Sequence, residues 1–174
     1  PKLDIQYKNV YGKEDTLVTI QIDMLLAQRF GMYYTDENGE KALPYIIHRT
    51  SLGCYERTLA YLIEEYAGAF PTWLAPTQVE LLPITDRTQD YARQVQAELE
   101  TYGIRCELDA RSEKIGKKIR DAQMEKVPYM LVLGDKEAEE NVVAVRSRKT
   151  GETETMPLAD FARKLCEEVR TKAR

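Results

Sequence analysis

The sequence of 174 residues is poor in the residue types from which metal sites, disulfide frameworks and membrane spans are built. It has one histidine, and its three cysteines, Cys54, Cys106 and Cys166, stand far apart without a CxxC pair. Scattered thiols of this kind are typical of a reducing compartment, so we expect a cytoplasmic protein. No apolar run approaches the ~20 residues that cross a bilayer, and no signal peptide opens the chain. We therefore expect no membrane partner.

A surplus of positive charge is also missing. Lys and Arg number 25 against 29 Asp and Glu, which gives a net charge of −4. This balance argues against a protein that coats nucleic acid through charge alone. A local basic surface is still possible, because the field near a patch depends on the charges close to it. Residues 111–120 carry five basic side chains against one acidic side chain, Glu113.

An initiator methionine is missing too. The chain opens with Pro1, and residues 1–4 (PKLD) resemble the middle of a strand. We expect the sequence to be a piece of a longer chain.

Residues 1–76 have the texture of antiparallel strands followed by one helix. Residues 17–23 are rich in β-branched side chains, and apolar stretches at 32–34 and 42–47 flank the turn sequence DENG at 36–39. Apolar residues at spacings of three and four predict a helix over about 52–66. Two prolines and a glycine follow in residues 67–76, and we expect a domain boundary after residue 76.

Residues 77–174 predict a second domain in which strands alternate with helices. Strands are expected at 79–84, 104–109, 129–133, 142–148 and 152–155, the last two as a hairpin. Helices are expected at about 88–102, 114–126 and the end of the chain. The predicted fold class is α/β, a mixed sheet with flanking helices, because alternation of this kind implies parallel crossovers.

One constellation suggests chemistry from spacing alone. Gly53, Arg57, Tyr61 and Glu64 share the helix face opposite the apolar stripe. Glycine permits close approach to the backbone, and arginine one turn later suits a phosphate or an aromatic base. A solvent-facing arginine on an ordinary helix explains the spacing equally simply, and by spacing alone it is the more frequent case.

The string IIHRTSLGCYER at 46–57 resembles motif 3 of the class II aminoacyl-tRNA synthetases, in the form found in the threonyl-tRNA synthetase family. Further strings resemble the same family in the same order: PKLD at 1–4, TIQID at 19–23, EYAGAFPTWLAPTQV at 65–79, EKIG at 113–116 and VPYMLVLGDKE at 127–137. The likeness covers the whole chain. It implies the end of a class II catalytic domain in residues 1–76 and an anticodon-binding domain in residues 77–174.

The resemblance implies an ATP and adenylate site with Mg²⁺ beside the ATP. Arg57 and Gln21 would be catalytic, with Arg57 on ATP and Gly53 against the adenine. Lys2, Thr19 and Gln21 would line the adenylate and threonine pocket. Thr16 stands near the ATP phosphates, where the family usually has Gln, so that contact departs from the family pattern.

The resemblance also implies that His48 is one of three protein ligands to a catalytic Zn²⁺. Such an ion has open positions, and threonine can chelate it through its amino and hydroxyl groups. Valine lacks the hydroxyl, so the site rejects it. The other ligands, a Cys and a His, would lie outside this chain, so we expect no zinc in the piece alone. Cys54 is expected near the substrate pocket and not on the metal.

In the second domain the resemblance implies contacts with anticodon bases. Arg146 and Glu137 would contact bases, with Lys114 and Ser112 nearby; Ser112 stands where Asn is frequent. Phosphate contacts are expected from the basic residues Lys117, Lys118, Arg120, Lys126 and Arg148. For this basic cluster a solvated helix face is the competing interpretation.

These expectations combine into one function. The chain is predicted to be part of a threonine–tRNA ligase that activates threonine with ATP and charges threonine tRNA, a homodimer when intact. Without motifs 1 and 2 and two zinc ligands, the piece alone is expected to be inactive. The alternatives are a non-catalytic tRNA-binding or accessory module, and a prolyl or histidyl synthetase, against which His48 together with Thr19 and Gln21 argues.

Overall fold

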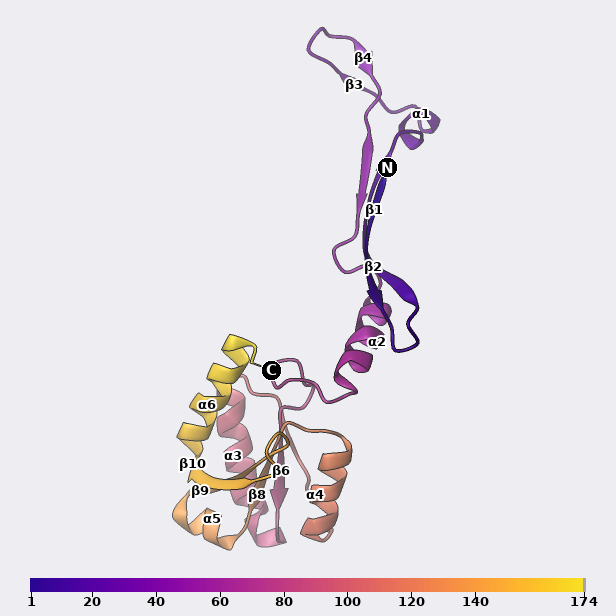
Figure 1. Ribbon diagram of the computed structural model, residues 1–174. Coiled ribbons are helices and arrows are strands. Elements are labelled where there is room, and N and C mark those ends of the chain that lie inside the picture. Colours follow the sequence, from indigo (N-terminus) through magenta and orange to yellow (C-terminus); the bar gives the residue numbers. More distant parts are fainter. Residues whose placement is uncertain (174) are drawn as a thin grey trace. The chain divides into compact units, whose positions relative to one another are not determined.

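The computed structural model describes residues 1–173, which form two compact units, Pro1–Ala67 and the residues from Gly68 onward (Figure 1). Each unit is described by itself. Within residues 1–173 no helix combines the length and the apolar character that a membrane crossing requires.

The first unit is built on a three-stranded antiparallel sheet in the order β1-β2-β5. Its strands are β1 (Lys2–Lys8), β2 (Glu14–Asp23) and β5 (Ile46–Arg49). A bulge in β2 at Leu17 shifts the register against β1. The predicted turn at 36–39 joins β3 (Tyr34–Thr35) to β4 (Lys41–Ala42). The helices are α1 (Leu26–Arg29) and α2 (Tyr55–Tyr66).

Apolar side chains of the first unit remain largely open to solvent. Strand register places Leu3, Ile22 and Ile47 on one sheet face, and their exposed fractions are 60%, 37% and 68%. The predicted apolar stripe of α2 is also exposed, with 77% for Tyr55 and 54% for Leu59. The face of α2 opposite this stripe is the one that contacts the β1–β2 hairpin, as shown below.

The second unit contains a five-stranded mixed sheet in the order β10-β9-β8-β6-β7. Strand β6 (Val79–Pro83) runs parallel to both β7 (Cys106–Leu108) and β8 (Tyr129–Leu133). Strands β9 (Val142–Ser147) and β10 (Thr153–Pro157) continue it in antiparallel fashion. The predicted mixed sheet with flanking helices is therefore confirmed.

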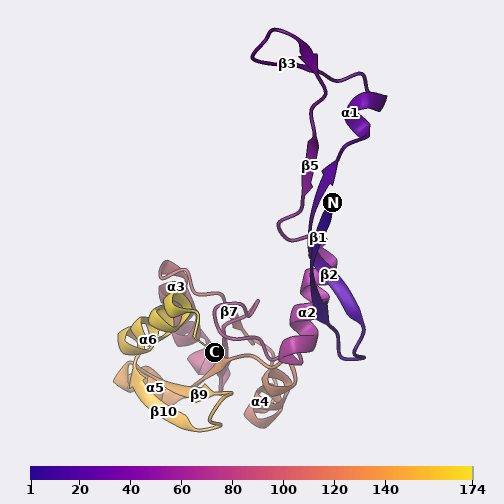
Figure 2. The ribbon, with the colours of Figure 1, turned by 45° about the horizontal axis from the view of Figure 1, so that its top comes forward.

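Helices cover the two faces of this sheet unequally (Figure 2). Helices α3 (Gln89–Thr101) and α6 (Leu158–Thr171) pack on one face, where they bury the main core around Leu81, Leu131 and Phe161. Helix α4 (Ile115–Met124) packs over β6 on the other face and buries a smaller core of Leu82, Met130 and Ala122. Among the described residues, this smaller core includes no side chain of β9 or β10.

Three local features of this unit differ from the sequence expectations. The short helix α5 (Asp135–Glu140) lies between β8 and β9, where no element was expected. The single turn η1 (Asp86–Thr88) precedes α3. Helix α4 ends at Met124, because Lys126 has a positive φ of 59°.

Residues 68–78, called the strap below, are fastened to the second unit. Arg105 donates to the carbonyls of Trp73, Ala75 and Pro76 from its guanidinium. Arg148 donates to the carbonyls of Ala69, Phe70 and Lys126. The hydroxyl of Thr72, which is 4% exposed, donates to Glu168 at 2.6 Å. The predicted domain boundary after residue 76 stays a prediction, and the contacts group the strap with the second unit.

The three cysteines differ in their surroundings. Cys54 is exposed directly before α2, and its thiol contacts Glu56 at 2.8 Å. Cys106 and Cys166 are partly buried against the main core. All three are free thiols.

Candidate functional sites

The first candidate site is the polar face of the three-stranded sheet. Antiparallel register sets Lys2, Gln21 and His48 directly across from one another on β1, β2 and β5. Side chains directly opposite one another in a sheet lie on one face. Four of the predicted residues, Lys2, Thr19, Gln21 and His48, therefore share one surface.

Two carboxylates organise this surface. Asp4 accepts from the Thr19 hydroxyl at 2.8 Å and forms an ion pair with Lys2 at 3.0 Å. These contacts lower the pKa of Asp4, the hydrogen bond of Thr19 contributing most. The pKa of Asp23 is also lowered, chiefly by the backbone N–H groups of Leu26 and Leu25.

His48 is the one imidazole available for a metal, and its Nε2 lies 3.5 Å from Asp23 Oδ2. Residues 1–173 contain no cluster of three His, Cys, Asp or Glu side chains able to hold a metal ion. A role for His48 as a zinc ligand stays a prediction.

A second group of predicted residues gathers where α2 meets the bulge of β2. Gly53 has a φ of +65°, and a Cβ placed on it would lie 2.2 Å from the carbonyl oxygen of Leu17. Arg57 donates from Nη1 to the carbonyl oxygen of Thr16 at 3.0 Å. Thr16, Gly53 and Arg57 are thus brought together. The close approach that this glycine permits in the structure is that of β2, while contact with adenine stays a prediction.

The rest of the same helix face also contacts the β1–β2 hairpin. The rings of Tyr61 and Tyr7 lie 4.3 Å apart, and Glu64 accepts from the backbone N–H of Val10 at 3.2 Å. The spacing of Gly53, Arg57, Tyr61 and Glu64 therefore reflects the packing of α2 on the hairpin, which neither of the two expected interpretations included.

The second candidate site is the partly open sheet face of the second unit. Arg146 lies on β9 directly across from Met130, which itself lies across from Glu80. The Nε of Arg146 is buried without a hydrogen-bond partner among the described residues. Glu137 lies in α5, where its carboxylate accepts from the N–H of Gly134 at 2.9 Å.

Ser112 and Lys114 lie in the connection between β7 and α4, and both are exposed. Ser112 lines a crevice of about 230 Å³ at the carboxyl end of β6. Glu137 follows the carboxyl end of β8, whereas Arg146 pairs near the amino end of that strand. The four predicted base contacts are therefore spread along the sheet and do not form one cluster. A spread of this kind suits a surface that reads several unpaired bases at separate positions.

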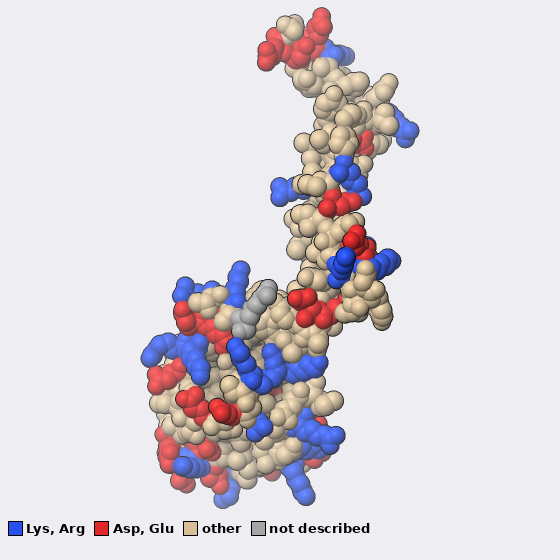
Figure 3. Space-filling model, viewed as in Figure 1, with Lys and Arg blue, Asp and Glu red and all other residues tan. Residues whose placement is uncertain are grey.

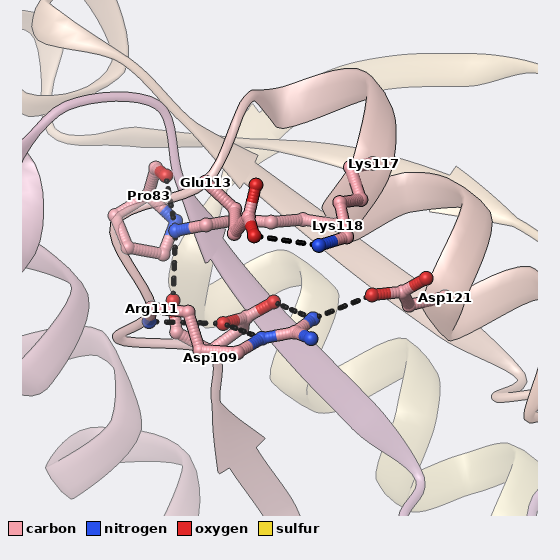
Figure 4. Close-up of polar contacts among 7 residues, drawn as sticks. All are labelled: Pro83, Asp109, Arg111, Glu113, Lys117, Lys118 and Asp121. Atoms are coloured by element: carbon pink, nitrogen blue, oxygen red, sulfur yellow. Dashed lines mark hydrogen bonds and ion pairs between the residues drawn. The ribbon is translucent and has the colours of Figure 1, made fainter.

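Two of the five basic side chains of segment 111–120 form ion pairs within the unit (Figure 4). Arg111 pairs with Asp109 at 2.7 Å and with Asp121 at 2.9 Å, and these partners raise its pKa. Lys117 pairs with Glu113 at 2.5 Å. Both signs of charge also occur across the face of this unit seen in Figure 3.

Two expected phosphate contacts need correction. Lys118 is only 3% exposed, and its ammonium donates to the backbone carbonyls of Pro83 and Asp109. Arg148 is directed at the carbonyls of the strap, and burial lowers its pKa. Neither cation is presented to the solvent in the way that a phosphate backbone requires.

An acidic hollow beside α4 was not foreseen. It has a volume of about 620 Å³ and is lined by acidic side chains together with Arg111 and Met124; the acids are Glu80, Glu107, Asp109, Asp121 and Glu125. Burial, reinforced by Glu125, Asp109 and Glu107, raises the pKa of Glu80 to about 7. The sequence signal was a glutamate inside an otherwise apolar buried strand.

Family models match both units. Residues 1–66 match the "tRNA synthetase class II core domain (G, H, P, S and T)", and residues 78–168 match the "Anticodon binding domain".

Curated relatives and a solved structure agree with these matches. The chain is 63% identical over 169 residues to a threonine–tRNA ligase of Clostridium perfringens and 59% identical over 174 residues to one of Clostridium botulinum. These alignments cover 97% and 100% of the chain but 26% and 27% of the relatives. The chain thus spans about a quarter of their length.

The structure is also similar to the RNA binding domain of threonyl-tRNA synthetase from Cryptosporidium parvum Iowa II. The TM-score is 0.81 at 36% identity, over 96% of this chain and 42% of that one. The resemblance to threonyl-tRNA synthetases is therefore confirmed, and the chain belongs to the anticodon-binding domain family, preceded by a segment of the class II synthetase core.

Proposed function

We propose that the chain works as part of a threonine–tRNA ligase in the cytoplasm. The second unit recognises the anticodon of threonine tRNA, and the first unit contributes motif 3 to the activation of threonine by ATP and Mg²⁺. The observation that carries the proposal is the match of residues 78–168 to the anticodon-binding domain, together with threonine–tRNA ligases as relatives along the whole chain. The intact enzyme is proposed to be a homodimer.

The anticodon surface of the proposal comprises Ser112, Lys114, Glu137 and Arg146. Arginine suits a base edge because two of its N–H groups match paired acceptors. Arg146 is partly exposed on β9, as a contact with a base requires. Glu137 has one oxygen on Gly134 and keeps the other for a base amino group.

The activation surface comprises Lys2, Thr16, Thr19, Gln21, Gly53 and Arg57. In activation the threonine carboxylate attacks the α-phosphorus of ATP, so the protein contributes positioning and charge stabilisation. The shared face of Lys2, Gln21 and His48 supports this assignment. A Zn²⁺ held in part by His48 would orient the amino and hydroxyl groups of threonine.

Binding of a threonine tRNA anticodon stem-loop to the 174-residue chain tests the anticodon assignment. Arg146→Ala should weaken binding roughly 10- to 100-fold, and most for the cognate loop, because a bidentate base contact is worth ~1–3 kcal/mol. Arg163→Ala is the matched control, since Arg163 is exposed on α6, which packs on the opposite sheet face. Equal binding of cognate and altered loops would refute base recognition by this chain.

The accessory-module alternative has one observation in its favour. The second unit has its own buried core, whereas the first unit buries almost no large apolar side chain. Threonine-dependent exchange of pyrophosphate into ATP distinguishes a catalytic role from an accessory one. The intact ligase should lose this exchange in Arg57→Ala and Gln21→Ala, whereas a module without catalytic role would leave it unchanged.

A further inference from the structure

Lys118 presents an unusual arrangement of charge. It is 3% exposed, and its Nζ donates to the carbonyl oxygens of Pro83 at 3.2 Å and Asp109 at 2.9 Å (Figure 4). Both acceptors are neutral, and none of the ion pairs formed by residues 1–173 includes Lys118. The nearby carboxylate of Asp109 is paired with Arg111. A buried ammonium without an ion pair is costly, and an additional acceptor would lower that cost.

Lys118 has a free donor and lies beside a crevice in which such an acceptor can bind. An ammonium has three N–H donors, and the two carbonyls take two of them. The side chain also lines the crevice of about 230 Å³ at the carboxyl end of β6. Strand β6 lies between β7 and β8, and the helices that follow β6 and β7 cover opposite sheet faces. Ligands bind preferentially at such switch points of strand order.

The remaining lining distinguishes a base from a phosphate. Asp86 and Glu113 contribute carboxylates, while Ser112 and Gln89 contribute a hydroxyl and an amide. Arg111 also lines the crevice, but it is paired with Asp109 and Asp121, and Glu113 is paired with Lys117. Asp86 forms no ion pair among residues 1–173, and its side chain accepts only from the Gln89 amide. Its carboxylate repels a phosphate, but it can accept hydrogen bonds from the amino and imino groups of a base. A base edge that combines an oxygen acceptor with N–H donors therefore matches this crevice better than phosphate does.

We propose that the crevice receives one unpaired base of the anticodon loop, and that Lys118 donates its third N–H to a carbonyl oxygen of that base. The inference rests on the proposed anticodon function and deepens it. It assigns to Lys118 a specificity role in place of the phosphate contact expected from the sequence. The two backbone carbonyls hold the ammonium in place before RNA binds.

The test is an abasic scan of the anticodon loop against the 174-residue chain. With the unaltered chain, removal of one particular base should weaken binding about tenfold, the value of one hydrogen bond to a charged group. In Lys118→Met, binding of the complete loop should fall by a similar factor, and removal of that base should then cost less than about twofold. Arg163→Met removes the same charge from an exposed site on α6, which packs on the opposite sheet face, and should leave the scan unchanged.

Far-ultraviolet circular dichroism and thermal unfolding would reveal a folding defect in Lys118→Met. A second variant keeps the test informative in that case. Ser112→Trp fills the crevice from an exposed position and leaves both hydrogen bonds of Lys118 in place. It should abolish the effect of the same base. The inference is overturned if both variants retain the full abasic penalty at every position, or if Lys118→Met only reduces the salt dependence of binding, as a phosphate contact predicts.

The two proposals fail in different ways. An unaltered chain that binds no stem-loop, or that ignores its bases, removes the anticodon function and the base crevice together. An unaltered chain that discriminates bases while the Lys118→Met and Ser112→Trp scans match it removes the crevice alone.

Discussion

At the scale of single residues, two positions are explained by contacts with the protein backbone before any ligand is considered. Gly53 is required by the carbonyl of Leu17, and Lys118 joins the ends of β6 and β7. Both positions attracted a functional interpretation from the sequence. Their structural partners could not be foreseen, because a β-bulge and a buried lysine leave no periodic signal.

Gly53→Ala should displace the start of α2 from β2. A methyl group would overlap the Leu17 oxygen, and the left-handed conformation alone costs ~1–2 kcal/mol for an L-residue. We expect the intact ligase carrying this change to lose at least about tenfold in threonine-dependent pyrophosphate exchange. Gly116→Ala is the control, because Gly116 lies in α4 and a Cβ there meets nothing within 4 Å. Equal activity of the two variants would contradict the packing argument.

Glu80 makes the stability of the second unit depend on pH. Its pKa is raised to about 7 in the fold, so the folded state holds a proton that the unfolded chain has released above its ordinary pKa of 4.5. The contribution of Glu80 to stability is therefore complete below about pH 4.5 and is lost as the pH rises to about 7. The loss is at most ~3 kcal/mol, and less where solvent enters the hollow.

Urea unfolding of the chain and of Glu80→Gln, at several pH values, measures this effect. The neutral amide should make the unfolding free energy of the variant exceed that of the unaltered chain at pH 8. The advantage should shrink toward pH 5, as Glu80 regains its proton. A difference that stays constant with pH would show that Glu80 ionises in the fold as it does in the unfolded chain.

At the scale of elements, the sheet of the second unit followed from the sequence, whereas its short helix and the strap did not. Apolar runs at 79–84 and 129–133 and the turn at 149–151 mark β6, β8, β9 and β10 clearly. Helix α5 has only six residues and no apolar periodicity, so tertiary contacts decide it. The strap resembled a linker because its prolines and glycine mark a break in regular structure. These residues do not predict which arginines donate hydrogen bonds to the carbonyls of the strap.

The arginines of the strap should contribute measurably to stability. Arg148→Met removes donors from three backbone carbonyls in a partly buried setting, and hydrogen bonds to charged groups contribute ~1.5–3 kcal/mol. We expect urea unfolding of the second unit to show a loss of about 2 kcal/mol. Arg163→Met, which removes an exposed pair with Asp160, should change the value by less than ~0.5 kcal/mol. Similar small losses in both variants would mean that the strap carbonyls bind water equally well.

At the scale of the whole molecule, the two units differ in how completely they bury their apolar residues. The second unit encloses the main core between its sheet, α3 and α6, and the first unit leaves one sheet face and the stripe of α2 exposed. This contrast could be predicted only in part. Amphipathic patterns identify an apolar face, but they do not tell whether the surface that would cover it belongs to the same chain.

The piece 68–174 should therefore fold by itself. We expect a cooperative urea transition for it, with a midpoint close to that of the second transition of the entire chain. The piece 79–174 lacks the strap and should unfold at clearly lower urea, because Thr72 and Gln78 are buried, with hydrogen bonds to Glu168 and Arg105 of the rest of the unit. Identical midpoints for the two pieces would show that the strap contributes nothing to folding.

The three thiols differ in burial, so a thiol reagent should modify one of them selectively. Burial raises the pKa of Cys106 to about 11, so near neutral pH almost none of it is the thiolate that reacts with alkylating reagents. Cys166 packs against the main core, whereas Cys54 is exposed where α2 begins. A maleimide fluorophore should therefore attach first at Cys54, which places a natural optical reporter three residues before Arg57 without any change to the sequence.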